Sequence, residues 1–287
     1  MEFGLTSPEA IRSRYRRAVQ FAKKLLTSTE LRAKVEVKED GTLVTGLDRK
    51  VEALFRRSIG RSVFKGDQIV SEAAQGEFDP GNGSCWVIDP LDGAHNYVND
   101  RLPYAVSIGY VLNNEPVFGV VVKPGLRGFS IVSALKGCGV EVDGLPFSPG
   151  TPITPVAGLD FKNTEEDKLT RVVGALHERY KEVRVLGSIV TGLTEVGLGS
   201  LSFYAHFAPR TWDVAAALAI LREAGKVTNV DDFDLAKLAA NGHRLRFTIA
   251  AQDEDVLGEA ASLIWETIKD LGEVKVLANL PFPQRRT

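Results

Sequence analysis

The most constraining feature of the chain is a short apolar run that leads directly into two aspartates. Cys85–Ile88 is apolar, Asp89 and Asp92 follow it, and Pro90 and Gly93 lie between and after them. Such a run, bounded by Pro and Gly, predicts a short buried strand that ends abruptly. Buried carboxylates are costly unless they are paired or bind a metal, and the segment holds no Lys or Arg. Carboxylates on a rigid turn suit Mg²⁺; the alternative is a plain strand-end turn capped by Asp and Gly.

The composition excludes several classes of protein. The 287 residues are 44% hydrophobic and 25% charged, which is typical of a globular chain with a sizeable core. A net charge of −2 offers no basic field for a nucleic-acid polymer or a membrane surface. No apolar stretch is long enough to span a bilayer, no secretory signal is visible, and Cys85 and Cys138 make no disulfide framework. We therefore expect a cytoplasmic protein that binds neither nucleic acid nor membrane.

The first half of the chain predicts helices followed by a β-meander. Ser7 and Pro8 are helix start signals. Four arginines near the N-terminus alternate with apolar residues, so we expect them on a solvated helix face; they are Arg12, Arg14, Arg16 and Arg17. A second helix is expected from Thr45 to Ile59, and Asn113-Asn114 predicts a hairpin. The expected strands are residues 69–72, 105–112, 117–122 and 128–133, and a short one within 137–144.

Prolines and glycines crowd residues 146–155 and predict a boundary. We expect an α+β subdomain over residues 1–150, with the Asp-Pro-Leu-Asp-Gly motif, and an α/β subdomain over residues 151–287, with a Trp-Asp motif and a substrate-side loop. The C-terminal segment from Pro281 is expected to be an extended tail. The expected strands of the second subdomain are residues 156–159, 183–186, 201–207 and 247–251, and its expected helices are 165–180, one that opens at Ser188, 212–224 and 255–271.

Three further acids occupy positions like those of the first two. Asp48 lies at a helix start, Glu72 ends a strand, and Asp213 follows Trp212 at the start of an Ala-rich helix. Taken alone, Asp48 is a first-turn helix acid, Glu72 a surface charge and Asp213 a helix N-cap. Only the combination of acids indicates a site.

These segments resemble the inositol monophosphatase family, within the wider fold class that includes fructose-1,6-bisphosphatase. The first family signature is similar to Trp86–Tyr97, and the second to Trp212-Asp213 followed by Glu223-Ala224-Gly225. The weaker matches, in chain order, are Leu43–Thr45 with Asp48 and Glu52, Ile69–Glu72, and Leu186-Gly187-Ser188. The resemblance implies the layered α/β/α/β/α sandwich of the sugar phosphatases. It also implies a Mg²⁺-dependent phosphomonoesterase that is a homodimer and is inhibited by Li⁺.

The resemblance implies two Mg²⁺ ions, with a third, weaker one near Glu72. Glu72, Asp89 and the backbone carbonyl of Leu91 would hold one ion. Asp89, Asp92 and Asp213 would hold the second, with Asp89 as the bridge. Such paired metals can clamp the attacking and leaving oxygens of an in-line displacement.

The turn after the second aspartate is the expected phosphate site. Gly93 lets the backbone approach a phosphate closely, and the N–H groups of the following helix start can bind an anion. The family also uses the loop-to-helix element at Gly187 and Ser188 near its substrate. The full set of expected substrate or phosphate residues is Asp92, Gly93, Ala94, His95, Gly187, Ser188, His206, Arg210 and Asp213.

One departure from the family pattern concerns the attacking water. After Asp-Gly the family usually has Thr, or less often Ser, whose hydroxyl helps to orient and deprotonate that water; this chain has Ala94. We expect Glu72, Asp48 and Asp89 to be the catalytic residues, with Asp48 acting through solvent. His95 is an alternative substitute for the hydroxyl. A catalytically weakened metal- or phosphate-binding paralogue is the alternative function.

The second departure concerns substrate choice. Inositol-specific members carry Glu seven residues before the aspartate of the second signature, where this chain has His206. Arg210 could bind a second phosphate in fork geometry, or it could cap or pair on the surface. The expected substrate is inositol monophosphate and/or fructose-1,6-bisphosphate, and the alternatives are 3′(2′),5′-bisphosphate nucleotidase or NADP phosphatase activity. His177 and His243 are expected to be ordinary surface or helix residues.

Overall fold

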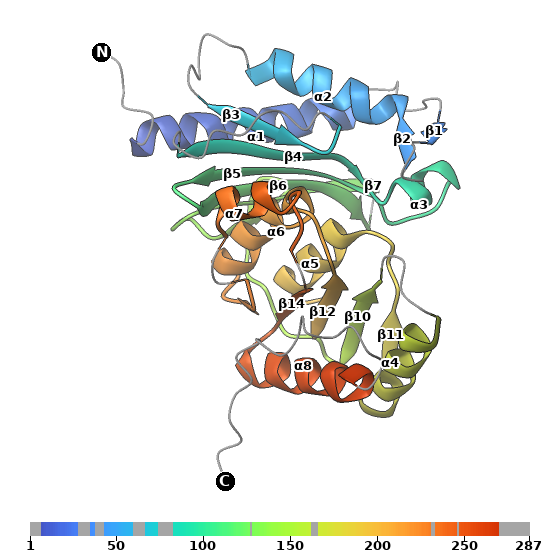
Figure 1. Cartoon of the computed structure of the whole chain (residues 1–287). Coiled ribbons are helices and arrows are strands. Elements are labelled where there is room, and N and C mark those ends of the chain that lie inside the picture. Colours follow the sequence, from blue (N-terminus) through green and yellow to red (C-terminus); the bar gives the residue numbers. More distant parts are fainter. Residues whose placement is uncertain are drawn as a thin grey trace.

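Helices and sheets alternate in five layers in the computed structural model (Figure 1). The layers are α1 with α2, a seven-stranded sheet, α5 with α6, a five-stranded sheet, and α4 with α8. This arrangement confirms the predicted layered α/β sandwich. The structure describes residues 7–27, 35–37, 43–59, 67–73, 83–126, 128–161, 166–230, 233–245 and 247–269.

The first layer consists of α1 (Pro8–Thr27) and α2 (Gly46–Ile59), whose apolar side chains pack on the seven-stranded sheet. The start of α1 is as predicted, since Ser7 Oγ accepts the Ala10 N–H at 3.2 Å. A short antiparallel pair, β1 (Val35–Val37) and β2 (Leu43–Thr45), precedes α2. No helix within the described ranges is long and apolar enough to cross a membrane.

The prediction of a solvated face for all four N-terminal arginines is wrong for Arg14. This side chain is 2% exposed, and its Nε donates to Asp67 at 2.7 Å. The same carboxylate accepts hydrogen bonds from Trp86 Nε1 at 2.9 Å and Tyr110 OH at 3.1 Å. A buried charge pair is tolerated only when its remaining polar atoms are also hydrogen-bonded. Here that network ties α1 to the sheet.

The seven-stranded sheet runs in chain order from β3 to β9, with β3 parallel to β4 and all later neighbours antiparallel. The hairpin predicted at Asn113-Asn114 is confirmed: both residues have positive φ, 51° and 64°, as a two-residue type I′ turn requires. The strands of this seven-stranded sheet are β3 (Gln68–Ser71), β4 (Ser84–Asp92), β5 (Ala105–Leu112), β6 (Glu115–Gly125), β7 (Gly128–Leu135), β8 (Val140–Val142) and β9 (Leu145–Phe147). The sequence did not predict β9.

The middle layer consists of α5 (Ile189–Gly197) and α6 (Thr211–Glu223), beside the short α7 (Leu235–Ala240). Residues 211–221 of α6 are all buried, because the helix lies between the two sheets. Two strand glycines allow its close approach. A Cβ on Gly119 would lie 2.1 Å from the Ala216 carbonyl oxygen, and one on Gly109 would lie 2.9 Å from Ala215 Cβ.

The five-stranded sheet has the order β11-β10-β12-β14-β13, with β10 parallel to β11 and β12, and β14 antiparallel to its neighbours. Its elements and outer helices are β10 (Val156–Asp160), α4 (Glu166–Arg179), β11 (Glu182–Arg184), β12 (Phe203–Phe207), β13 (Val227–Thr228), β14 (Phe247–Ala251) and α8 (Glu254–Ile268). The sequence did not predict β13 or α7. The subdomain division at residue 150 stays a prediction, and the tail from Pro281 lies outside the described residues.

Candidate metal centre

The strand that carries the first two acids is longer than predicted. β4 includes nine residues, Ser84–Asp92, all buried, and it does not end at Ile88. Val87 and Cys85 pack with α5 and α6, on what we call the inner face of the sheet, whereas Trp86 and Ile88 pack with α1 and α2. This is the regular two-residue alternation of a strand.

The alternation changes phase between Asp89 and Asp92, where the pairing of β4 with β5 is irregular. Asp89 continues the inner face of Val87. Leu91 would also lie on the inner face of a regular strand, but it packs with α1 and α2. The shift falls around Pro90, which has no N–H to donate to the ladder. Asp92 therefore returns to the face of Asp89, and the two carboxylates point to the same side.

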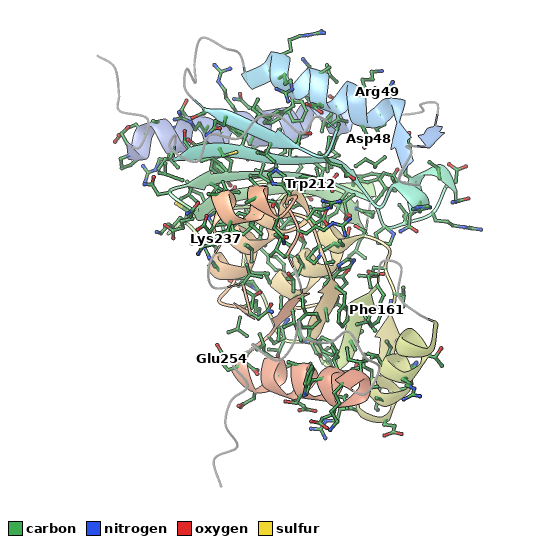
Figure 2. The ribbon with its side chains drawn as sticks, in the orientation of Figure 1. Asp48, Arg49, Phe161, Trp212, Lys237 and Glu254 are labelled. Atoms are coloured by element: carbon green, nitrogen blue, oxygen red, sulfur yellow. The ribbon has the colours of Figure 1, made fainter. Side chains whose placement is uncertain are left out.

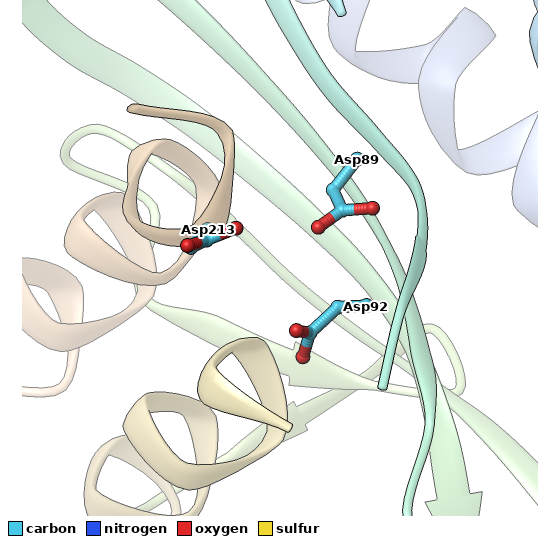
Figure 3. A group of neighbouring side chains, drawn as sticks. All are labelled: Asp89, Asp92 and Asp213. Carbon is cyan, nitrogen blue, oxygen red and sulfur yellow. The ribbon is translucent and has the colours of Figure 1, made fainter. Parts of the chain in front are cut away.

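Three carboxylates from distant parts of the chain meet at this face. Figure 3 shows Asp89 and Asp92 on β4 pointing toward Asp213 from α6. Each offers an oxygen, and the three oxygens lie within 4.8 Å of one another. The three residues are only 1%, 8% and 4% exposed, respectively. Within the described ranges this is the one group of three or more potential metal ligands.

Burial and the neighbouring acids disfavour the ionised forms of Asp89 and Asp92. Burial is the main cause that raises the pKa of Asp89 well above its usual value, and repulsion by Glu72, Asp92 and Asp213 raises it further. The N–H of Leu91 donates to Asp89 Oδ1 at 2.9 Å and lowers the pKa by a smaller amount. Since the charges that act on Asp89 are acidic, its ionised form calls for a cation.

Asp92 accepts more hydrogen bonds than Asp89 does. Burial raises its pKa to about 6, while hydrogen bonds from Ser188 Oγ and the Val190 N–H lower it and repulsion by Glu72 raises it. The Val190 bond measures 2.9 Å, and both donors bind the same oxygen, Oδ2. The start of α5 therefore fixes the orientation of this carboxylate.

Asp213 is the third residue of α6, and the hypothesis that it is the N-cap is wrong. The N-cap is Arg210, whose backbone N–H donates to Asp213 Oδ2 at 2.7 Å. An acid at the third position that binds back to the start of its helix is half of a capping box. This bond and the close contact of α6 with Gly109 and Gly119 place Asp213 at the cluster.

Glu72 follows β3 and is half-buried. The adjacent Ser71 Oγ donates to Glu52 of α2 at 3.1 Å, which anchors this end of the strand. Glu72 acts electrostatically on both Asp89 and Asp92, so the structure places its charge beside the cluster. It is outside the group of oxygens within 4.8 Å of one another, and its role as a metal ligand stays a prediction.

Asp48 lies in the first turn of α2 and is 5% exposed. Figure 2 shows it on the opposite side of the seven-stranded sheet from Trp212. It does not belong to the carboxylate cluster. Its action on water, and the role of the Leu91 carbonyl as a ligand, stay predictions.

The turn after Asp92 requires glycine for two reasons. Gly93 has φ +82°, and a Cβ there would lie 2.9 Å from the Pro103 carbonyl oxygen and 3.2 Å from that of Gly187. It precedes α3 (Ala94–Val98), a single short helical segment. Ala94 packs against the core of α1 and α2, and the side chain of His95 is exposed. Their contacts with phosphate stay predictions.

The loop at Gly187 and Ser188 meets this turn, and its place near the substrate stays a prediction. Ser188 is the N-cap of α5, and its Oγ donates to Asp92. Sequence reasoning missed two residues that hold the loop. Asn96 Nδ2 donates to the Leu186 carbonyl at 2.8 Å, and Asp160 accepts the Gly187 N–H at 2.8 Å. Asp160 ends a predicted strand, as Asp89 does, so the same signal pointed to it.

The remaining candidates are His206 of β12 and Arg210, the N-cap of α6. His206 of β12 is 3% exposed. The guanidinium of Arg210 lies 5.8 Å from the Trp212 ring centroid and donates to the Gly242 carbonyl. The prediction that His243 is an ordinary surface or helix residue is wrong. It is 8% exposed, and its ring centroid lies 5.5 Å from that of Trp212. Burial lowers its pKa, and the charge of Arg210 adds to this.

The five-layer sandwich, with acids where the first sheet meets the middle helices, is the arrangement of a class of layered phosphatases. The chain belongs to the inositol monophosphatase family, whose model matches residues 9–268. A relative named fructose-1,6-bisphosphatase/inositol-1-monophosphatase, from Thermotoga maritima, is 27% identical over 230 residues, which cover 80% of this chain and 85% of that protein.

Two solved structures share the fold. An inositol monophosphatase of Thermotoga maritima has a TM-score of 0.74 at 24% identity, covering 91% of this chain and all of that one. An inositol monophosphatase/NADP phosphatase in complex with Mg²⁺ and phosphate has a TM-score of 0.71 at 18% identity, covering 86% of this chain and 94% of that one. Family and fold are therefore as predicted, and the chain is a phosphoric monoester hydrolase.

The donor set fits a divalent cation. Members of the family use Mg²⁺, which prefers carboxylate oxygens and keeps several waters. Three buried acids, of which Asp92 and Asp213 raise the pKa of Asp89, are stabilised by such an ion and destabilised by its loss.

Proposed function

We propose that the protein hydrolyses a small phosphomonoester, inositol monophosphate and/or fructose-1,6-bisphosphate, in a Mg²⁺-dependent reaction. The observation that carries the proposal is the meeting of Asp89, Asp92 and Asp213, buried and within 4.8 Å of one another. Family membership supports phosphate ester hydrolysis. The names of the Thermotoga maritima relative support the two substrates.

In this proposal two or three Mg²⁺ ions would supply a water of lowered pKa and a counter-charge for the departing oxygen. Asp89, Asp92 and Asp213 would hold them, with Glu72 and the Leu91 carbonyl. The chain's own residues then position the reactants.

The protein's part in proton transfer falls to its acids, since Ala94 has no hydroxyl. Glu72 would orient the attacking water and accept its proton, because it directly follows β3 and its charge acts on Asp89. Asp48 would act through solvent, and Asp89 by fixing the ligand geometry. A positioned general base typically contributes roughly 10²–10⁴-fold.

Backbone amides and the second half of the chain would bind the substrate. The N–H groups that follow Gly93 would bind the phosphate, beside the loop at Gly187 and Ser188. His206 would give or accept one hydrogen bond to a sugar hydroxyl. Arg210 could take a second phosphate only by leaving Gly242 and the Trp212 ring, so we favour substrates in which one phosphate is recognised.

We extend the proposal to a cytoplasmic homodimer that Li⁺ inhibits. Family membership alone supports these properties. Dimerisation is testable by light scattering and inhibition by titration with LiCl.

The test is steady-state phosphate release by the full chain, with Mg²⁺ and with EDTA. The panel contains inositol-1-phosphate, fructose-1,6-bisphosphate, NADP and 3′-phosphoadenosine 5′-phosphate. We expect Mg²⁺-dependent release from one of the first two. Release from NADP alone would change the substrate class, as the name of one structural neighbour suggests. No release from any compound would leave the weakened paralogue.

The matched variant is Asp89→Asn, which keeps the shape of the side chain and removes a ligand charge. We expect turnover to fall by at least 10³-fold, the range seen when a central catalytic group is lost. Asp143→Asn is the control, because Asp143 is not part of the cluster and accepts the backbone N–H of Ile131 at 2.8 Å. Full activity of Asp89→Asn would refute the metal centre.

A further inference from the structure

Asp160, at the end of β10, is a buried acid that none of the proposed steps uses. It is 5% exposed. Its Oδ1 accepts the Gly187 N–H at 2.8 Å, and its Oδ2 accepts the Leu186 N–H at 3.2 Å and the Tyr204 hydroxyl at 2.7 Å. Burial raises its pKa, and the three hydrogen bonds oppose that rise. Two consecutive peptide groups are thus held by one carboxylate.

The same loop is held from its other side by the first half of the chain. The side-chain amide of Asn96 donates to the Leu186 carbonyl at 2.8 Å and to the Pro103 carbonyl at 2.7 Å. Leu186 therefore gives its N–H to β10 and its C=O to the segment that follows Gly93. Gly187, at φ +68°, fits between, with a would-be Cβ only 3.0 Å from Asn96 Nδ2.

The reach of Tyr204 to Asp160 also depends on a specific neighbour. A Cβ on Gly192 of α5 would lie 2.2 Å from the Tyr204 ring. Tyr204 is fully buried, so its hydroxyl has a fixed partner. Asp160 therefore lies beside a buried, tightly packed side chain and not on a mobile loop.

The loop that Asp160 holds ends at the carboxylate cluster. Ser188 directly follows Gly187, and its Oγ and the Val190 N–H both donate to Asp92 Oδ2. A displacement of the loop would move both donors. Outer partners that orient metal ligands typically matter 10- to 100-fold for metal affinity.

We propose that Asp160 is a positioning residue: by holding the peptide groups of Leu186 and Gly187, it keeps Ser188 and Val190 on Asp92 and so fixes how Asp92 faces a divalent cation. The inference rests on the metal centre of the proposed function and is independent of the substrate. The competing interpretation is that Asp160 only stabilises the fold.

The central variant is Asp160→Asn, which is isosteric. Its amide oxygen can accept one N–H, but its NH₂ group would face the other donor. We expect Mn²⁺ binding by the full chain, measured by titration calorimetry, to weaken about tenfold. Asp143→Asn should bind Mn²⁺ like the wild type. Unchanged Mn²⁺ affinity in folded Asp160→Asn would overturn the proposal, whatever happens to the melting temperature.

A double-mutant cycle separates positioning from a general loss of stability. If Asp160 acts through Ser188, Asp160→Asn should weaken Mn²⁺ binding only about threefold in a Ser188→Ala background, less than in the wild type. Strictly additive losses would contradict the proposed route through the loop.

Hydrogen exchange gives a readout that needs no metal. In the metal-free protein one of the two amides, that of Leu186 or that of Gly187, should exchange at least tenfold faster in Asp160→Asn than in the wild type, because it loses its acceptor. If wild-type protein binds no Mn²⁺, the proposed function fails, and the proposal for Asp160 fails with it even if exchange accelerates. Faster exchange with unchanged Mn²⁺ affinity would reduce Asp160 to a structural anchor.

Discussion

Position 94 carries a methyl group, where the family resemblance implies a hydroxyl. Ala94 follows Gly93 at the start of α3 and packs partly against the core of α1 and α2. The cluster acids Asp89 and Asp92 lie immediately before it in the chain. The structure therefore brings three acids together, and the side chain at position 94 carries no hydroxyl.

We expect Ala94→Thr to raise kcat severalfold, because a hydroxyl would help to orient the attacking water. The gain should be well below the roughly 10²–10⁴-fold typical of a general acid–base group, since metal supplies most of the activation. Ala94→Val is the matched control, with the same branching and no hydroxyl. Phosphate release at saturating substrate measures both. A kcat that stays level or falls in Ala94→Thr alone would show that the hydroxyl is not a missing part.

The sequence predicted the positions of some residues and failed to predict those of others. Asp89 and Asp213 were recognisable because each lies within a longer motif. Asp160 carried the same strand-end signal as Asp89, but an acid after a strand is common, and its partners Leu186 and Gly187 are brought to it only by the fold. Arg14 was misplaced because helical spacing does not reveal that Asp67 lies opposite it.

At the scale of elements, the contact between α6 and the seven-stranded sheet decides where Asp213 lies. Gly119 leaves room for the backbone of α6 at Ala216. A side chain there would push the start of the helix away from β4. The position of Asp213 thus depends on two strand glycines, Gly109 and Gly119, that are not part of the carboxylate cluster.

We expect Gly119→Ala to destabilise the fold by about 1–3 kcal/mol, as overpacking does, and to weaken Mn²⁺ binding by moving Asp213. Gly174→Ala is the control: Gly174 lies in α4 with open space around its Cα, so alanine should stabilise by roughly 0.5–1 kcal/mol. Urea unfolding and Mn²⁺ titration measure the two effects. Native affinity in Gly119→Ala would contradict the link between packing and the site.

Long elements with clear periodicity were predictable, and short or irregular ones were not. The expected helix 45–59 and strand 247–251 match α2 and β14 closely. β4 was cut short because its phase shift around Pro90 breaks the two-residue pattern that identifies a strand. β13 and α7 are too short to show any period.

At the scale of the whole molecule, the cluster makes stability depend on pH and on metal. In the folded protein the pKa of Asp92 is raised from 3.8 to about 6. The folded chain therefore binds this proton more tightly than the unfolded chain. That stabilisation is complete below the unfolded value and is lost as the pH rises through about 6. The raised pKa of Asp89 acts in the same direction.

We expect Mg²⁺ to raise the melting temperature by about 5 °C at neutral pH and by much less near pH 5, where protons occupy the carboxylates. Thermal unfolding with saturating Mg²⁺ and with EDTA measures this. Asp92→Asn should reduce the difference between the two pH values. An equal effect of Mg²⁺ at both pH values would show that it binds elsewhere.

Because α6 lies between the two sheets and late in the chain, the parts of the metal centre are synthesised in a fixed order. A growing chain emerges from the ribosome N-terminus first, so Asp89 and Asp92 are made long before Asp213. Until α6 reaches the inner face of β4, β5 and β6, that face lacks the helix that packs most extensively on it. Only a chain translated through both halves can therefore assemble the centre, and a product that ends before α6 would hold two of its three carboxylates.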